Sequence, residues 1–260
     1  MKFIKRIFKR LFGRKLALNR RTFCSPPSKY SKKIARIAGS IDSDNTADGE
    51  VELKTLKLLG FKQENIQIFA QESDTIILAE KQIDIKRNAV TLKVISIRGS
   101  DVAFTENAFK DWISNFDVGK LFKGAEHKGF AQSTDLITSS REFQNFIKNR
   151  KDTIFLVTGH SRGGAIAAEI MNHMLKELDF PGDNIYGYTF GAPSTIRGED
   201  EVDTRIGELV GLHQIENEND NVPKLPPQAW GWSNRGTVHT ISFPGKMFEA
   251  HSLKSYVRFL

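Results

Sequence analysis

One stretch of the chain, residues 153–170, passes from an apolar run through a glycine-rich turn into an alanine-rich amphipathic run. The apolar run is typical of a buried strand, because strands covered on both faces have continuous hydrophobic sequences. The alanine-rich run has the spacing of a helix that packs by one face. We therefore predict a strand, a sharp turn with Ser161 at its apex, and a helix.

The same patterns predict helices and strands on both sides of this stretch. Alternating apolar and polar residues favour strands, and apolar residues three or four positions apart favour helices. Strands are expected over residues 65–80, with a turn at 72–74, and over 89–97, 184–189, 208–215 and 237–243; helices are expected over 52–59, 105–116 and 132–149 and from 251 onward. Strands that alternate with helices along 260 residues indicate one α/β domain.

Positive charge is concentrated near the N-terminus. The chain has 38 Lys or Arg, 31 Asp or Glu and a formal charge of +7, but residues 1–41 hold 13 of the basic residues and no acidic one. The remaining residues are net acidic, so the predicted domain lacks the basic surface of a nucleic-acid-binding protein. No nucleic-acid partner is expected. The alternative, a scaffold whose basic arm binds nucleic acid, predicts binding that falls steeply with salt.

The first 21 residues have an amphipathic, basic pattern. Lys and Arg occupy one helical face, and the other face carries Ile4, Ile7, Phe8, Leu11 and Phe12. Such a helix lies in a bilayer interface, so residues 1–21 are expected to contact a peripheral membrane surface. An organelle-targeting segment and a solvated tail are the alternatives.

This pattern also bears on location. Charges interrupt the apolar stretch every two or three residues, so no cleaved secretory signal is expected, and no apolar run of the sequence is long enough to span a bilayer. We expect the protein at a membrane surface or in the cytoplasm, with organelle targeting and non-classical secretion left open. The sequence predicts no oligomeric state.

Polar stretches indicate where the folded domain begins. Residues 25–28 and 42–50 are typical of linkers. We divide the chain into a basic segment with linker, residues 1–41, and a domain over residues 42–260. Cys24 is the single cysteine, which excludes an intramolecular disulfide; it is interpreted as a bystander thiol, with lipidation as the alternative.

The turn at Ser161 fits the pattern G-x-S-x-G over residues 159–163. In a nucleophile elbow this pattern holds a serine in a strained turn, with its hydroxyl above the sheet. The helix that follows directs its free N–H groups, beginning with that of Arg162, toward an oxyanion formed there. A second donor is needed, and Ser100, in the polar loop after strand 89–97, is the candidate; an ordinary β-turn is the alternative for that loop.

A triad acid and base should follow the serine in the chain. The loop after strand 208–215 contains Glu216, Glu218 and Asp220, and spacing alone does not choose among them. For the base, His251 lies on a loop before the last helix, whereas His239 lies within a strand, so position and chain order favour His251. A further histidine, at position 127, precedes the serine and is interpreted as structural.

Several short motifs, in this order, resemble those of the class 3 lipases, a group of α/β hydrolases that includes fungal triacylglycerol lipases and plant phospholipase A1-type enzymes. The resemblance covers most of residues 50–260. The motifs are IRGS at 97–100, DW at 111–112, HKGF at 127–130, GHSRGG at 159–164, TFGAP at 189–193, DNVPKLPP at 220–227 and HSLKSYV at 251–257.

The resemblance implies an α/β-hydrolase fold with a mostly parallel central sheet flanked by helices. It implies Ser161 as nucleophile, Asp220 as acid and His251 as base, with Ser100 and Arg162 at the oxyanion hole. The implied activity is hydrolysis of lipid or phospholipid acyl esters through an acyl-enzyme, with no metal or organic cofactor. The alternatives are an esterase or acyltransferase for soluble esters and a non-catalytic membrane-binding or partner-binding module.

Overall fold

The computed structural model describes residues 18, 21–42, 50–86, 88–98, 128–197 and 209–260. Its main feature is a seven-stranded sheet in the order β1-β2-β3-β4-β5-β7-β9. The strands are β1 (Ile66–Gln71), β2 (Asp74–Ile85), β3 (Asn88–Arg98), β4 (Thr153–His160), β5 (Ile185–Phe190), β7 (Leu212–Asn217) and β9 (Thr237–Ile241). The strands β1, β2 and β3 are antiparallel neighbours, and the strands from β3 to β9 are parallel. The predicted mostly parallel sheet is confirmed.

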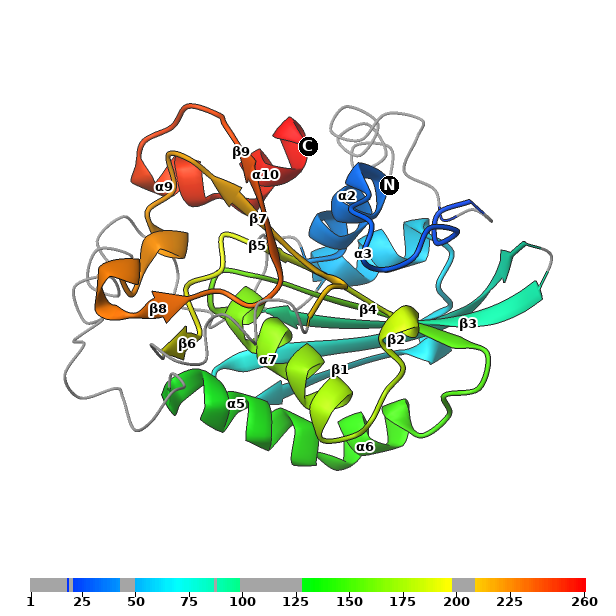
Figure 1. Ribbon diagram of the computed structural model, residues 1–260. Coiled ribbons are helices and arrows are strands. Elements are labelled where there is room, and N and C mark those ends of the chain that lie inside the picture. Colours follow the sequence, from blue (N-terminus) through cyan, green and yellow to red (C-terminus); the bar gives the residue numbers. More distant parts are fainter. Residues whose placement is uncertain (1–17, 19–20, 43–49, 87, 99–127, 198–208) are drawn as a thin grey trace.

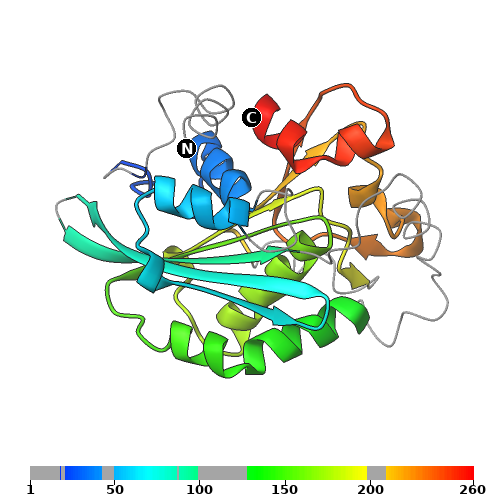
Figure 2. The ribbon, with the colours of Figure 1, turned by 180° about the vertical axis from the view of Figure 1, so that it is seen from behind.

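Helices cover both faces of this sheet (Figures 1 and 2). One face carries α2 (Lys32–Ile41), α3 (Glu50–Leu58) and α10 (Leu253–Phe259), and the other carries α5 (Lys128–Ser139), α6 (Arg141–Ile147) and α7 (Arg162–Lys176). The short helix α9 (Met247–His251) precedes α10. Four single-turn 3₁₀ helices complete the chain's helices in the described part: Gln63–Asn65, Gly182–Asn184, Val222–Lys224 and Gln228–Trp230. A separate two-stranded sheet pairs β6 (Ile196–Arg197) with β8 (Trp232–Ser233).

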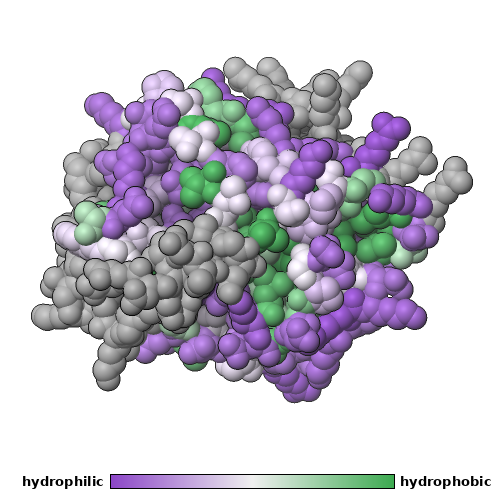
Figure 3. Space-filling model, viewed as in Figure 1, coloured by the Kyte–Doolittle hydropathy of each residue, from purple (hydrophilic) through white to green (hydrophobic). Residues whose placement is uncertain are grey.

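Two apolar cores lie between these layers. Every residue of β4 is buried, because helices cover the strand on both faces. Side chains on the face shown in Figure 3 are mostly hydrophilic, with apolar side chains in small areas between them. In the described part of the chain, no helix is long and apolar enough to cross a membrane.

The N-terminal part of the described chain differs from the predicted linker. The helix α2 buries Ile34, Ile37 and Ile41 in the core, and Ser31 caps it by accepting a hydrogen bond from the backbone N–H of residue 34. Phe23 is also buried, and its ring meets that of a tyrosine on β5 at 5.1 Å. Residues 22–41 therefore pack with the domain that we predicted to begin at residue 42.

Two other predicted elements differ in their limits. The helix expected over residues 132–149 is two helices, because Ser140 ends α5 and caps α6 by accepting a hydrogen bond from Phe143 N–H. The strand expected from residue 208 begins at Leu212, after a turn. The helix expected over residues 105–116 lies outside the described residues.

Candidate active site

The turn between β4 and α7 places Ser161 at the carboxyl edge of the sheet. Ser161 has φ 55° and ψ −128°, a conformation that costs a non-glycine residue about 1–3 kcal/mol. The turn is tied to the neighbouring strand, because Ser161 N–H donates to the Phe190 carbonyl at 2.9 Å. Gly159 is required by the tight approach of α7, since a Cβ at this position would lie 2.3 Å from the Gly163 carbonyl oxygen. The local sequence therefore forms the strained elbow expected from its pattern.

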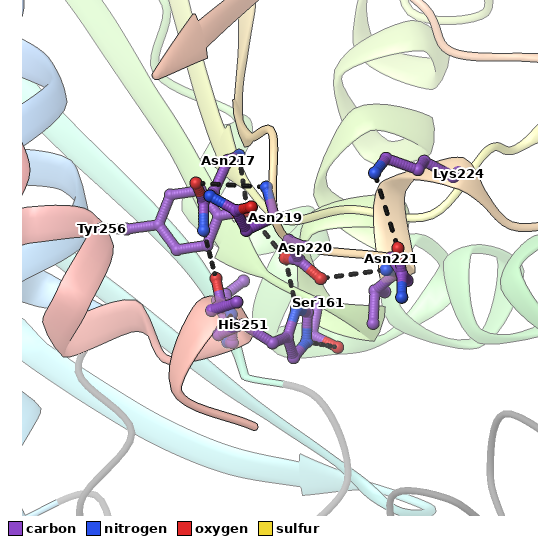
Figure 4. A network of polar contacts seen from close by, with 11 residues as sticks. Ser161, Asn217, Asn219, Asp220, Asn221, Lys224, His251 and Tyr256 are labelled. Carbon is purple, nitrogen blue, oxygen red and sulfur yellow. Dashed lines mark hydrogen bonds and ion pairs between the residues drawn. The ribbon is translucent and has the colours of Figure 1, made fainter. Parts of the chain in front are cut away.

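Ser161, His251 and Asp220 form one hydrogen-bonded row (Figure 4). The Ser161 Oγ lies 2.8 Å from His251 Nε2, and His251 Nδ1 lies 2.7 Å from Asp220 Oδ2. Asp220 is completely buried, and Ser161 and His251 are each 4% exposed. The carboxylate accepts a hydrogen bond from Nδ1–H, which leaves Nε2 of a neutral imidazole to accept the serine proton. The structure thus brings together three side chains that lie up to 90 positions apart in the sequence.

Two further donors hold the Asp220 carboxylate. The Val222 backbone N–H donates to Oδ1 at 2.9 Å, and the Tyr256 hydroxyl donates to Oδ2 at 2.7 Å. The same hydroxyl accepts a hydrogen bond from Asn217 N–H at 3.0 Å. Burial, and then the adjacent Asp220 charge, raise the pKa of Tyr256, so its hydroxyl remains a donor. The carboxylate is therefore fixed in both position and orientation.

The backbone around His251 is fixed by its neighbours. His160 Nε2–H donates to the His251 carbonyl at 2.7 Å, and the two imidazole rings lie 4.5 Å apart. Asn217, at the end of β7, donates through its side chain to the Ala250 carbonyl at 3.1 Å. Gly191 has φ +54°, and a Cβ there would lie 3.0 Å from Asp220 Oδ2 and 3.1 Å from the His251 ring. Substitution of Gly191 would crowd the pair.

Comparison with known proteins identifies the family. The model for the class 3 lipases matches residues 94–230. The chain belongs to the class 3 lipase family. Its similarity to the Fusarium solani "Secreted mono- and diacylglycerol lipase 1" is 31% identity over 147 residues, which cover 54% of this chain and 40% of that relative. A second relative, "Secreted mono- and diacylglycerol lipase MDL3" of Malassezia globosa, is 30% identical over 106 residues, which cover 40% of this chain and 34% of the relative. The matched part is therefore less than half the length of either relative.

Solved lipase structures share the fold of this class 3 lipase. A crystal structure of a lipase from Rhizopus microsporus var. chinensis matches with a TM-score of 0.55 and 21% identity, covering 86% of this chain and 82% of that one. A mutant form of MDLA from Penicillium cyclopium matches with a TM-score of 0.51 and 17% identity, covering 82% and 78% of the respective chains. At these identities, the similarity shows an α/β-hydrolase fold.

Of the two residues predicted to form the oxyanion hole, Arg162 lies among the described residues and Ser100 does not. The Arg162 backbone N–H lies in the first turn of α7, where N–H groups have no partner within the helix. Its side chain binds Asp74 on β2 and Ser133 on α5. Ser100 and the predicted structural histidine at 127 lie outside the described residues.

The other candidate side chains lie elsewhere in this class 3 lipase. Glu216 is partly buried and accepts a hydrogen bond from Asn234 at 3.0 Å, and Glu218 is exposed. His239 contacts His213, with Nε2 of the first 2.9 Å from Nδ1 of the second. Among the described residues, the carboxylate that contacts His251 is that of Asp220.

Sequence reasoning missed the residues that support the row. Tyr256 lies in a helix with an ordinary apolar pattern, and nothing in the local sequence shows that its hydroxyl reaches Asp220. His160 was included in the serine motif but given no role of its own. Asn217, at the end of β7, has no sequence feature that distinguishes it from the polar residues that follow. The contacts that define these roles join residues that are far apart in the sequence.

Proposed function

We propose that this class 3 lipase is a serine-dependent carboxylic-ester hydrolase that acts on acyl lipids. The observation that carries the proposal is the buried row of Ser161, His251 and Asp220 at the edge of the sheet. Nucleophile, base and orienting acid lie within hydrogen-bond distance of one another, which is the arrangement that activates a serine hydroxyl. Chain order within the α/β-hydrolase fold supports the same roles.

In the first half of the proposed reaction, Ser161 Oγ forms a bond to the ester carbonyl carbon while His251 Nε2 takes the hydroxyl proton. Asp220 keeps the imidazole in the Nδ1–H tautomer and stabilises its cation. The carbonyl oxygen becomes an oxyanion, with the backbone N–H groups of Arg162 and Ser100 proposed as its donors. In comparable sites the loss of one such donor costs about 3–4 kcal/mol in transition-state stabilisation.

Collapse of the tetrahedral intermediate breaks the bond to the alcohol oxygen, and His251 gives its proton to that leaving group. The acyl group is then on Ser161. Water enters, loses a proton to His251 and attacks the acyl carbon, and the returning proton restores the serine hydroxyl as the fatty acid leaves.

Among acyl lipids we propose mono- and diacylglycerols as the first substrates to test. The names of the two relatives support this choice. Hydrolysis of phospholipids, as by a phospholipase A, is the second candidate. The basic sequence of residues 1–21 favours binding to an anionic membrane surface, where phospholipids are the abundant acyl esters. We propose that this segment brings the enzyme to an anionic membrane surface.

The proposed function is tested by hydrolysis of a panel containing monoacylglycerol, diacylglycerol, triacylglycerol, phosphatidylcholine and p-nitrophenyl butyrate. Purified wild-type protein is expected to release fatty acid from the acylglycerols and p-nitrophenol from the soluble ester, and Ser161→Ala to release neither. Ser139→Ala, on the exposed side of α5, is the matched control and is expected to match the wild type. Full ester hydrolysis by Ser161→Ala would contradict the proposal.

A further inference from the structure

The Arg162 side chain takes no part in the row of Ser161, His251 and Asp220. It forms a bidentate ion pair instead, with Nε 3.0 Å from Asp74 Oδ1 and Nη2 3.0 Å from Asp74 Oδ2. The same Nη2 donates to Ser133 Oγ at 2.7 Å. The Asp74 side chain is completely buried, whereas that of Arg162 is 20% exposed. Arg162 is thus held by three hydrogen bonds directly beside the nucleophile in the sequence.

These bonds join three elements at the same edge of the sheet. Asp74 is the first residue of β2, and its neighbour Thr75 pairs with Arg98, the last residue of β3. The end of β3 pairs in turn with the end of β4, immediately before the nucleophile turn. In the sequence, β3 ends two positions before Ser100, the other proposed oxyanion donor. Ser133 lies on α5, the first described element after β3.

The Arg162–Asp74 ion pair is expected to matter more for the orientation of Arg162 than for the stability of the fold. A buried ion pair loses the hydration of both charges, and its replacement by well-packed apolar residues is often neutral or stabilising. A bidentate guanidinium–carboxylate pair, however, fixes orientation as few other interactions do. Here the fixed residue is the one whose backbone N–H we propose as an oxyanion donor, and a displacement of about 1 Å in an active site can cost about 10²-fold in rate.

We propose that Asp74 and Ser133 are positioning residues that, by holding the Arg162 side chain, fix the Arg162 backbone N–H where it donates to the oxyanion. The inference rests on the proposed hydrolase function. The acidic and hydroxyl side chains act through Arg162 and do not touch the substrate. Their effect falls on the transition state, in which the oxyanion exists, and not on substrate binding.

The test uses the full-length variants Asp74→Asn and Ser133→Ala. Asp74→Asn keeps the shape of the side chain but removes the charge, and Ser133→Ala removes one hydrogen bond. With p-nitrophenyl butyrate, Asp74→Asn is expected to lower kcat by about 10- to 100-fold, below the loss of about 10²–10³ for a donor removed outright, with KM changed by less than about threefold. Ser133→Ala is expected to lower kcat by about three- to tenfold.

A second substrate separates positioning from a general loss of structure. In a thionoester, sulfur replaces the carbonyl oxygen and accepts hydrogen bonds weakly, so the wild-type enzyme should hydrolyse the oxygen ester much faster than the thionoester. Displacing an oxyanion donor slows the oxygen ester more than the thionoester. The ratio of the two rates is therefore expected to fall in both variants.

The matched control is Glu169→Gln, which breaks another buried ion pair of α7. Glu169 Oε1 accepts from Arg235 Nε at 3.0 Å, and Glu169 lies seven positions along the helix from Arg162, about 10 Å away by helical rise. Glu169→Gln is expected to leave kcat and the rate ratio within about twofold of the wild type.

Three outcomes decide the question. A lower rate ratio in Asp74→Asn and Ser133→Ala, but not in Glu169→Gln, supports the proposal. Equal losses on both esters in the folded variants, or no loss, overturn it. If Asp74→Asn does not fold, as judged by thermal unfolding, the rate ratio of Ser133→Ala decides. An active Ser161→Ala would instead overturn the hydrolase function itself, so the two failures are distinguishable.

Discussion

The carboxyl group of Glu216 should make the stability of the protein depend on pH. This side chain lies near the end of β7, four positions before Asp220; it is partly buried, and its Oε1 accepts a hydrogen bond from Asn234. Burial raises the pKa of Glu216 to about 7, and the Asp220 charge acts in the same direction. The hydrogen bond from Asn234 and the charge of Lys224 oppose the shift but do not cancel it.

The size of the effect follows from the difference between the folded and ordinary pKa values. The ordinary value is 4.5 and the folded value about 7. At about 1.4 kcal/mol for each pKa unit, ionisation of Glu216 should cost the folded state about 3 kcal/mol. Between these two pKa values the folded state binds more protons than the unfolded state. The contribution of protonated Glu216 to the free energy of unfolding is therefore full below pH 4.5 and is lost as the pH rises through about 7.

The variant Glu216→Gln keeps the hydrogen-bond acceptor for Asn234 but cannot ionise. Urea unfolding of both proteins at several pH values from about 5 to 8 measures the difference in their unfolding free energies. That difference is expected to change by about 2–3 kcal/mol in favour of the variant over this range.

The control for this prediction is Glu218→Gln, which alters an exposed carboxylate two positions away, just after β7. Its difference from the wild type should stay within about 0.5 kcal/mol across the range. Parallel pH profiles for the wild type and Glu216→Gln would refute the reasoning, because a carboxyl that titrates alike in the folded and unfolded states gives no pH-dependent difference.

Two further predictions concern Tyr256 and the N-terminal segment. Tyr256→Phe keeps the ring, which packs 5.4 Å from that of Phe243, but removes the hydroxyl that donates to Asp220 and accepts from Asn217 N–H. The free energy of unfolding, measured in urea, should therefore fall by about 2–3 kcal/mol. A loss below about 0.5 kcal/mol would contradict this account. The N-terminal segment is tested in the Ser161→Ala background, so that the lipid stays intact. At low salt the full-length Ser161→Ala protein should co-sediment with anionic phosphatidylserine vesicles, and removal of residues 1–17 should abolish this binding. The reason is that each Lys or Arg near the membrane surface contributes about 1 kcal/mol to binding. Unchanged sedimentation would refute a membrane role for this segment.

The local parts of the fold could be predicted from sequence because their causes are local. The apolar run before Ser161, the glycines around it and the alanine-rich run after it each occupy a few adjacent residues, and the structure has β4, the strained turn and α7 in that order. The helix α2 was missed although Ile34, Ile37 and Ile41 have helical spacing. Residues 25–28 and 42–50 on either side of it were interpreted as linkers, so the segment between them was assigned to the basic N-terminal part, whereas its isoleucines pack in the core.

The choice of the acid shows what local sequence could not supply. Glu216, Glu218 and Asp220 lie within five positions, and the sequence pattern predicts all three in one loop. Spacing left all three open, and the family resemblance favoured Asp220. In the structure Glu216 lies in β7, where it accepts a hydrogen bond from Asn234. The turn after β7 leaves Glu218 exposed and buries Asp220 against His251. These differences arise from contacts with α9, α10 and the loop before β9, which are distant in the sequence.

The central claim is that Ser161 is the nucleophile, and covalent labelling tests it most directly. A fluorophosphonate reacts with an activated serine hydroxyl and leaves a stable adduct, which peptide mass spectrometry locates. We predict one adduct, on Ser161, that forms with loss of ester hydrolysis and is absent from Ser161→Ala and strongly reduced in His251→Ala. An adduct on another residue that accompanies the loss of activity, with Ser161 unmodified, would contradict the account.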